Sequence, residues 1–459
     1  MAEKKQYKSV YFVGAGGIGM AALVRYYLSK GLKVAGYDRT RTALTDELTA
    51  EGAEITYDDA AELIPGYCRD KATTLVVYTP AVPSTHPGLT YFRDGGFDVM
   101  KRAQVLGLLT HDSKGLCFSG THGKTTTSSM AAHILHSSEI GCNAFLGGIL
   151  RNYDSNFMLS PTSPYTVIEA DEFDRSFLQL HPAIAAITSM DADHLDIYGT
   201  LQEYRKAFKA FASQVSRTLI VKQGLDITPE DTKARILHYS YDDPAADYHA
   251  VNPRPDEVGH YIFDLVYPGG TIGGIRVGIP GWINVENSVA AAAVCLNHGV
   301  APEAIKEAIG TYSGVKRRLD AHINTPHLSY IDDYAHHPKE LASAISSLRG
   351  MFPGRKITAI FQPHLFTRTR DFADDFAQAL SKVDKLILLD IYPAREEPIP
   401  GVTSGLIFDK VTCPDKVLLK KEELMAYLEN EPVDVLVTFG AGNIDRFIAP
   451  VTELLKKRL

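Results

Sequence analysis

The chain has 459 residues, a formal net charge of −8 at pH 7, 45% hydrophobic residues and 22% charged residues. This composition is ordinary for a globular protein, and the length exceeds the roughly 250–300 residues at which one core stops growing, so two or three domains are expected. The negative charge argues against a nucleic-acid surface. No apolar stretch of signal-peptide length precedes the first glycine, and no window approaches the roughly 18 uninterrupted apolar residues of a membrane span. Five scattered cysteines without a CxxC pair predict reduced thiols in a cytoplasmic protein.

The first predicted unit begins with an apolar strand over 10–13, which runs into the glycine-rich segment GAGGIGM and then a helix. A second strand over 33–37 ends at Asp38, about 20 residues after the glycines, as in a dinucleotide-binding βαβ unit. NAD(P), a nucleotide-sugar or close packing of helix on strand would each explain this pattern. Strands over 74–78 and 97–100 complete a Rossmann-like domain, which we place at 1–107.

The most informative stretch is 119–130, SGTHGKTTTSSM, where an apolar strand meets a helix. Gly120 and Gly123 let successive N–H groups point at one spot beside the helix N-terminus, which favours an anion. Lys124 can reach terminal phosphate oxygens, and the Thr125 hydroxyl can hold Mg²⁺. The segment is therefore predicted to be a phosphate loop, and the alternative is an ordinary glycine-containing turn.

This loop departs from the common pattern G-x-x-x-x-G-K-[ST], because Phe118 stands where that pattern has its first glycine. It is the shorter form G-x-x-G-K-T. We expect it to belong to a second α/β domain at 108–314. The strands of that domain are predicted over 116–119, 165–169, 183–188, 218–221, 260–267 and 275–279, with an alanine-rich helix over 284–298.

Two strands of the second domain are predicted to end in acidic segments. Glu169 directly follows the apolar strand, in the usual place for a Mg²⁺ ligand or an acid that orients the nucleophile. Its neighbours Asp171, Glu172 and Asp174 are alternatives, and we expect those that are not ligands to be solvated or to cap the next helix. In DADHLD, His194 can coordinate a second metal ion or simply titrate at the surface.

Two further segments suggest nucleotide contacts. Asn284 and Asn287 lie three residues apart on one helical face and can read an adenine edge, although Asn284 can instead cap the helix. Arg317 and Arg318 lie at the junction with a third domain, placed at 315–459. They can reach ATP phosphates when the domains close, or form a basic hinge surface.

The third domain alternates helices with strands predicted over 328–331, 356–361, 385–389 and 433–439. Three of these strands are followed by the polar segments DDYAHHP, QPHLFTRTR and DIYPAREE. Since the carboxyl ends of parallel strands share one edge of a sheet, these segments are expected to converge there. Because the stability of the fold does not require polar segments to converge, their convergence suggests a binding site at this edge.

The motifs VGAGGIGM, GTHGKTTT, EADEFDRSF, DADHLDIY, GVKRRL, DDYAHHP, FQPHLFTRTRDF and IYPAREEPIPGV resemble, in this order, those of the Mur ligases of peptidoglycan synthesis. The third-domain motifs are most similar to the branch that adds L-alanine or to the related branch that reuses murein tripeptide. The resemblance implies that the carboxylate of UDP-N-acetylmuramate attacks ATP to give an acyl phosphate, from which L-alanine then displaces phosphate. It also implies that the glycine-rich loop serves the UDP-sugar and that NAD is not used.

The resemblance assigns roles to matching positions. It implies ATP binding by Gly120, Thr121, His122, Gly123, Lys124, Thr125, Thr126, Asn287, Arg318 and Asp333. It implies UDP-sugar binding by Gly14, Gly16, Gly17, Ile18, Gly19, Met20 and Asp38, and amino-acid binding by Tyr334, His336, Arg368 and Arg370. Catalytic roles fall to Lys124, Glu169, His194 and Arg318, and the ligands at two expected Mg²⁺ sites are Thr125, Glu169 and His194.

Two positions depart from the family pattern. Relatives usually carry histidine where this chain has Ile283, so adenine contacts would depend more on Asn287. Many alanine-adding relatives carry arginine where this chain has Leu365, so the alanine carboxylate would depend on Arg368 or Arg370.

Several functions therefore stay open at the level of sequence. The first is the alanine ligase, and the second is the tripeptide-recycling ligase. An NAD(P)-dependent oxidoreductase is motivated by GAGGIG and Asp38, and a catalytically inactive nucleotide-binding regulator is a further alternative. The expected partners are UDP-N-acetylmuramate, L-alanine and ATP, without nucleic acid or membrane insertion, and the protein is expected to be a monomer or homodimer.

Overall fold

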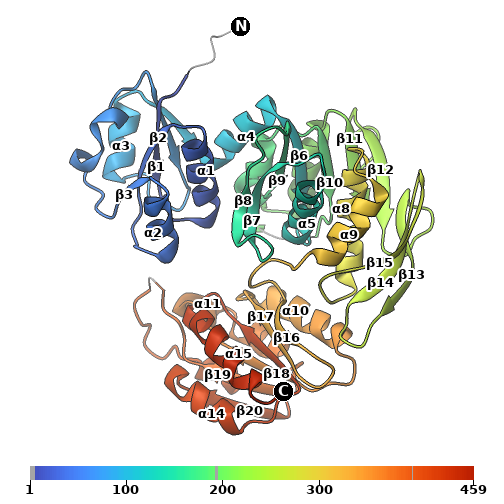
Figure 1. Cartoon of the computed structure of the whole chain (residues 1–459). Helices are drawn as coiled ribbons and strands as arrows, with labels where there is room; N and C mark the ends of the chain where they lie inside the picture. The colour runs from blue at the N-terminus through green and yellow to red at the C-terminus, as the bar shows by residue number, and fades with distance from the viewer. Residues whose placement is uncertain (1–5, 192–194, 395) are drawn as a thin grey trace. The chain divides into compact units, whose positions relative to one another are not determined.

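The computed structural model describes residues 6–191, 195–394 and 396–459 (Figure 1). They form three sheets, of five, ten and six strands, each accompanied by helices. The predicted α/β class with three sheet-containing parts is confirmed. Contacts between backbone positions divide the chain into two compact units. The first comprises Met1–Val251, Asp264–Ile275 and Glu286–Ser313, and the second Asn252–Phe263, Arg276–Val285 and Gly314–Leu459. The boundaries 1–107, 108–314 and 315–459 stay a prediction.

The first sheet is parallel and has the order β3-β2-β1-β4-β5. Its strands are β1 (Ser9–Val13), β2 (Lys33–Tyr37), β3 (Glu54–Thr56), β4 (Thr74–Tyr78) and β5 (Asp98–Lys101). Its helices are α1 (Ile18–Ser29), α2 (Ala43–Ala50), η1 (Ala61–Leu63), η2 (Gly66–Cys68), α3 (Pro87–Asp94) and α4 (Arg102–Asp112). Every residue of β1 is buried, as its apolar run predicts for a central parallel strand.

The second sheet has the order β15-β14-β13-β12-β11-β10-β6-β9-β7-β8. Its strands are β6 (Lys114–Ser119), β7 (Asn143–Leu150), β8 (Ser155–Met158), β9 (Tyr165–Glu169), β10 (Ile184–Ile187), β11 (Thr218–Lys222), β12 (Arg235–Ser240), β13 (Tyr248–Pro255), β14 (Tyr261–Tyr267) and β15 (Gly270–Arg276). Its helices are α5 (Lys124–Ser137), η3 (Phe173–Gln179), α6 (Leu195–Tyr198), α7 (Leu201–Ser213), α8 (Ile283–Leu296) and α9 (Pro302–Thr311). The strand predicted over 275–279 is wrong, because the strand lies earlier, in a glycine-rich segment whose composition disfavours strands.

The first two sheets share a hydrophobic core, which explains why the first sheet and most of the second belong to the first unit. Met20 and Leu23 of α1 are buried in the same cluster as Ile168 of β9. The rings of Tyr26 on α1 and Phe145 on β7 are 5.7 Å apart. The glycine-rich segment and the phosphate loop are therefore held on one compact body.

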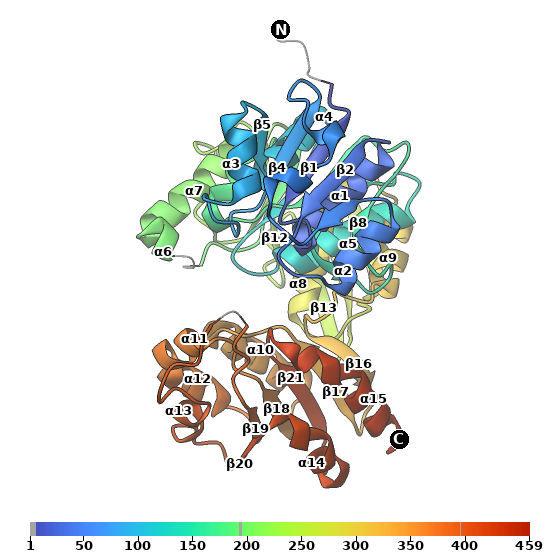
Figure 2. The ribbon, with the colours of Figure 1, turned by 90° about the vertical axis from the view of Figure 1, so that its left-hand side faces the viewer.

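The third sheet has the order β16-β17-β21-β18-β19-β20, with only β16 antiparallel to its neighbour (Figure 2). Its strands are β16 (Asp320–Asn324), β17 (Ser329–Asp333), β18 (Ile357–Phe361), β19 (Lys385–Leu389), β20 (Asp415–Leu419) and β21 (Val435–Phe439). Its helices are α10 (Pro338–Met351), α11 (Phe366–Asp371), α12 (Ala373–Leu380), α13 (Gly405–Phe408), η4 (Lys421–Glu423), α14 (Leu424–Asn430), η5 (Asn443–Phe447) and α15 (Ile448–Lys456). Since β17, β18 and β19 run in the same direction, their polar carboxyl ends share one edge, as predicted.

The cysteines and the helix lengths can be compared with the sequence predictions. All five cysteines are buried and none forms a disulfide. Within the described ranges, no helix is long and apolar enough to cross a membrane.

Candidate functional site

The phosphate loop connects β6 to α5 through two glycines with positive φ. Gly120 has a φ of +143° and Gly123, the N-cap of α5, a φ of +82°. A Cβ at Gly120 would lie 2.1 Å from Thr188 Oγ1, so the close approach of β10 also requires glycine here. The loop conformation thus depends on these two positions.

Hydroxyl groups that follow β10 brace the loop from one side. Thr188 donates hydrogen bonds from its Oγ1 to the carbonyl oxygens of Ser119, at 3.1 Å, and of His122. The backbone N–H of His122 donates to Ser189 Oγ at 2.7 Å. Neither residue was predicted from the sequence, although two hydroxyls after a buried apolar strand were a usable signal.

Glu169 lies against the loop, where its position at the end of β9 predicted it. Thr125 Oγ1 donates to Glu169 Oε1 at 2.9 Å, and the N–H of Gly147 donates to Glu169 Oε2 at 2.9 Å. The Thr125 hydroxyl and the Glu169 carboxylate are oxygen ligands of the kind that Mg²⁺ prefers. Among the described residues, no group of three or more His, Cys, Asp or Glu could hold a metal ion. The predicted ligand His194 lies outside the described residues.

Lys124 is held by Glu172, which was predicted to be either an alternative metal ligand to Glu169 or a solvated or capping residue. Its Nζ lies 3.1 Å from Glu172 Oε2 and donates to the carbonyl of Gly120 at 3.3 Å. Burial raises the pKa of Glu172, and the Lys124 charge partly offsets this. Burial by itself lowers the pKa of Lys124, but the charges of Glu172, Asp171 and Glu169 outweigh it and raise that pKa. Glu172 is therefore neither solvated nor a side-chain cap, because segments distant in sequence bury it.

Asn287 packs against the loop from α8. A Cβ at Gly123 would lie 2.9 Å from Asn287 Oδ1, which also accepts a hydrogen bond from Thr127 Oγ1 at 3.3 Å. Asn287 is buried, and Asn284 Nδ2 donates to the carbonyl of Pro280 at 2.6 Å. The structure thus brings Asn287 beside the phosphate loop and engages Asn284 in a local contact.

The polar face of α5 is fixed by a buried histidine. His133 Nδ1 lies 2.7 Å from the hydroxyl of Tyr153, and its Nε2 lies 3.0 Å from Thr311 Oγ1. Burial, followed by the neighbouring charge of His136, lowers the pKa of His133 from 6.5 to about 4. The folded protein therefore holds this ring neutral at pH values where an unfolded chain takes up a proton.

We expect the substitution His133→Gln to reduce the loss of stability in mild acid. Because the pKa is depressed in the folded state, stability is present above pH 6.5 and is lost as the pH falls toward 4. Between pH 7.5 and 5.0 the protonation of His133 is expected to lower the free energy of unfolding by about 2 kcal/mol, which corresponds to several degrees of Tm. Melting curves at both pH values measure the difference, with the exposed His111→Gln as control. An equal pH dependence in wild type and His133→Gln would contradict the assignment.

In the glycine-rich segment, Asp38 closes the loop on itself. Its Oδ2 accepts the N–H of Gly16 at 2.7 Å, and its Oδ1 accepts the N–H of Thr40 at 3.1 Å. Gly14 has a φ of +92°. These contacts explain the glycine and acid pattern without a dinucleotide ribose.

Arg102, which the sequence analysis missed, joins this segment to the second sheet. Its Nε donates to the carbonyl of Gly19 at 3.1 Å. Burial lowers the pKa of Arg102, and the charges of Asp171 and Glu169 oppose that shift. Asn156 Nδ2 on β8 donates to the carbonyl of Ile18 at 2.7 Å. The start of α1 is thus fixed from both sides.

In the second unit, polar side chains gather after β17, β18 and β19. The His364 ring stacks on Tyr392 with centroids 5.8 Å apart and lies 5.9 Å from the His336 ring. Arg368 Nη1 approaches His364 Nδ1 at 3.5 Å. Burial, followed by His336 and Arg368, lowers the pKa of His364 to about 4, so the ring is neutral at pH 7. Arg370 instead pairs with Asp371.

The two arginines at the start of this unit differ in their surroundings. Arg317 Nε lies 3.0 Å from Asp332 Oδ2, a fully buried carboxylate, so Arg317 supports the sheet. Asp333 accepts the N–H groups of Leu319 at 2.7 Å and Ala335 at 2.8 Å, and burial raises its pKa to about 6. Arg318, the predicted phosphate contact, directly precedes Leu319, whose N–H is held by Asp333.

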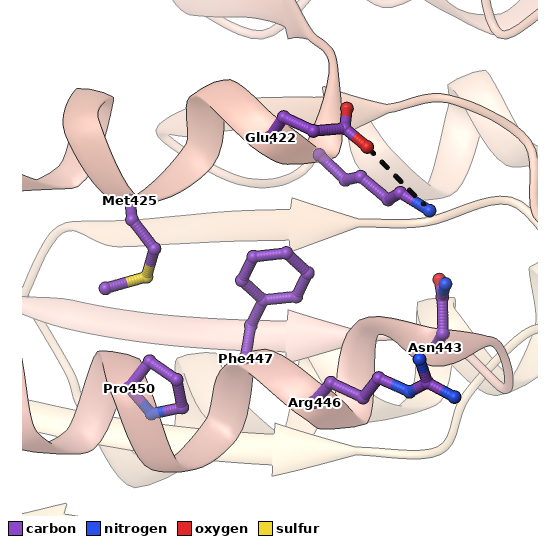
Figure 3. A pocket seen from close by; sticks show the side chains of 7 residues that line it. Glu422, Met425, Asn443, Arg446, Phe447 and Pro450 are labelled. Atoms are coloured by element: carbon purple, nitrogen blue, oxygen red, sulfur yellow. Dashed lines mark ion pairs between the residues drawn. The ribbon is translucent and has the colours of Figure 1, made fainter.

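A cavity of about 280 Å³ in the second unit lies apart from the predicted site residues. Figure 3 shows Met425 and Pro450 at one end of it, Arg446 and Asn443 at the other end, and Phe447 between them.

Three family models match the chain. The Mur ligase catalytic domain matches residues 9–114, the Mur ligase middle domain 118–295, and the Mur ligase glutamate ligase domain 317–442. The chain is 55% identical to the UDP-N-acetylmuramate–L-alanine ligase of Parabacteroides distasonis over 98% of both chains. It is 53% identical to the enzyme of that name from Phocaeicola vulgatus, over 98% of this chain and 99% of the relative.

Solved structures share the fold. The crystal structure of UDP-N-acetylmuramate-alanine ligase from Thermotoga maritima has a TM-score of 0.78 and 25% identity, covering 98% of this chain and 100% of that one. A murein peptide ligase from Psychrobacter arcticus has a TM-score of 0.68 at 19% identity and covers 98% of both chains.

Proposed function

The chain belongs to the Mur ligase family, and from this membership we propose that it joins L-alanine to the carboxylate of UDP-N-acetylmuramate with ATP as the energy source. The observation that carries the proposal is the identity of 53–55% over nearly the whole chain with two relatives named UDP-N-acetylmuramate–L-alanine ligase. The phosphate loop supports it, because Lys124, Thr125 and Glu169 meet there.

The chemistry explains why a phosphate loop is needed. A carboxylate is a poor acylating agent, because its leaving group would be oxide. Attack of a carboxylate oxygen on the γ-phosphorus releases ADP and forms an acyl phosphate. The amino group of L-alanine then attacks the acyl carbon, loses a proton, and phosphate leaves as the amide forms.

The loop residues act on the charge of the transferred phosphoryl group. The Lys124 ammonium and the N–H groups at the start of α5 offset that charge, in a site whose donors are fixed before the reaction. Thr125 and Glu169 would hold Mg²⁺, which would supply further positive charge at the phosphate oxygens. We propose Asn287 for the adenine side and the segment 14–20 for the UDP-sugar.

The test is a substrate panel. The full chain is incubated with ATP, Mg²⁺ and UDP-N-acetylmuramate, together with either L-alanine or the tripeptide L-alanyl-γ-D-glutamyl-meso-diaminopimelate, and phosphate release is measured. We expect release with L-alanine and formation of the alanyl product by mass spectrometry. Release only with tripeptide would favour the recycling ligase, the named function of a solved relative.

For the amino-acid pocket, the geometry favours Arg368 over Arg370 as the carboxylate anchor. Arg368 lies in the cluster of His364 and Tyr392, whereas Arg370 is half exposed and paired with Asp371. We expect Arg368→Ala to raise the KM for L-alanine at least about tenfold, because a planar guanidinium binds both carboxylate oxygens. Steady-state kinetics with Arg370→Ala as the matched control, expected within about twofold of wild type, measure this. A larger rise of the KM for L-alanine in Arg370→Ala than in Arg368→Ala would assign the carboxylate anchor to Arg370.

The cytoplasmic location and the state of monomer or homodimer stay predictions. Cell fractionation tests the first and sedimentation analysis of the purified chain the second.

A further inference from the structure

Glu172 lies beneath the phosphate loop, where nothing in the local sequence requires an acid. Its side chain has no exposed surface. Both carboxylate oxygens face the ammonium of Lys124, with Nζ at 3.2 Å from Oε1 and 3.1 Å from Oε2. A buried carboxylate is costly unless a cation and hydrogen-bond donors compensate it, so its presence at this point is informative.

Two tyrosines from neighbouring helices fix Glu172 in place. The hydroxyl of Tyr204 on α7 donates to Glu172 Oε1 at 3.4 Å, and that of Tyr198 on α6 donates to the Glu172 carbonyl. The Tyr204 hydroxyl also lies 2.8 Å from Thr121 Oγ1 in the phosphate loop. The carboxylate is therefore tied to the loop it serves through both Lys124 and Thr121.

The geometry also defines which direction is left for Lys124 to use. An ammonium has three N–H donors in fixed directions. Glu172 accepts from one side and the Gly120 carbonyl from another. A lysine held at two points keeps one donor for a phosphate oxygen and has already lost the rotamer freedom that a mobile lysine loses on binding.

We propose that Glu172 is a positioning residue that, together with the Gly120 carbonyl, fixes the Lys124 ammonium in the loop so that its remaining donor meets the terminal phosphate of the nucleotide. This rests on the proposed use of ATP and does not depend on which amino acid is joined. Glu172 contacts no reacting atom and acts only through Lys124.

The test uses Glu172→Gln, which keeps the shape and an acceptor for Tyr204 but removes the charge. The matched control is Glu203→Gln, because Glu203 on α7 is a half-exposed acid that pairs with Lys206 and has no part in the loop. We expect Glu172→Gln to weaken ATP binding about tenfold by calorimetry and to lower kcat about 10- to 100-fold, with the KM for L-alanine unchanged. Glu203→Gln is expected to stay within about twofold on every measure.

A double-mutant cycle separates positioning from a general structural role. In the Lys124→Ala background, Glu172→Gln is expected to change ATP affinity by less than about twofold, since the residue it acts through is gone. A full tenfold further loss in that background would overturn the proposal, as would wild-type ATP affinity and kcat in Glu172→Gln alone. ATP affinity is measured without the amino acid, so failure of the alanine assay leaves this result interpretable.

Discussion

Lys124→Ala is expected to lower turnover at least about 1,000-fold, the effect of losing about 4 kcal/mol of transition-state stabilisation. The ammonium is the only side-chain cation that the described loop segment 119–126 places at the start of α5. Binding of UDP-N-acetylmuramate is expected to persist, because the glycine-rich segment belongs to the other sheet of the unit. Phosphate release and calorimetry with the sugar nucleotide measure the two effects.

The same substitution is expected to destabilise the first unit, because it leaves Glu172 buried beside no ammonium. Removing one partner of a buried pair typically costs about 3–5 kcal/mol. The double variant Lys124→Ala/Glu172→Gln is therefore expected to recover most of the lost Tm and to remain inactive. Loss of sugar-nucleotide affinity in the folded double variant would contradict the division of the two ligands between the two sheets.

Gly120→Ala is expected to reduce ATP affinity and turnover more than about 100-fold each. A φ of +143° is adopted essentially only by glycine, and the new Cβ would lie 2.1 Å from Thr188 Oγ1 and 2.8 Å from the Ser189 nitrogen. The strain costs about 1–3 kcal/mol, and displacing Thr188 releases the carbonyls of Ser119 and His122 that it holds.

The control for this prediction is Gly66→Ala. Gly66 lies in η2, without a positive φ, and a Cβ there would meet no atom within 4 Å. Its Tm and ATP affinity are expected to match those of wild type. Normal ATP affinity in Gly120→Ala would show that the loop does not need this conformation.

Local pattern was sufficient for the central features of the fold and the site. The step from β6 through the loop to α5 was predicted because glycines, a lysine and an apolar strand are adjacent in sequence. Glu169 was predicted to lie beside the loop because the ends of parallel strands share an edge, and its contact with Thr125 agrees. By contrast, β15 was misplaced, since its glycines give no strand signal and only pairing in the sheet makes it one.

The sequence by itself therefore determined the family, the α/β class and the position of the phosphate loop, because those depend on contiguous residues and on their order. Only the tertiary structure decided what surrounds the loop. Glu172 is buried beside Lys124, and Tyr204, 32 residues further along the chain, hydrogen-bonds its carboxylate. Asp38 closes its own glycine loop, and Thr188 braces the phosphate loop from another strand. Such contacts join residues far apart in sequence, and their energies depend on packing that no local pattern encodes.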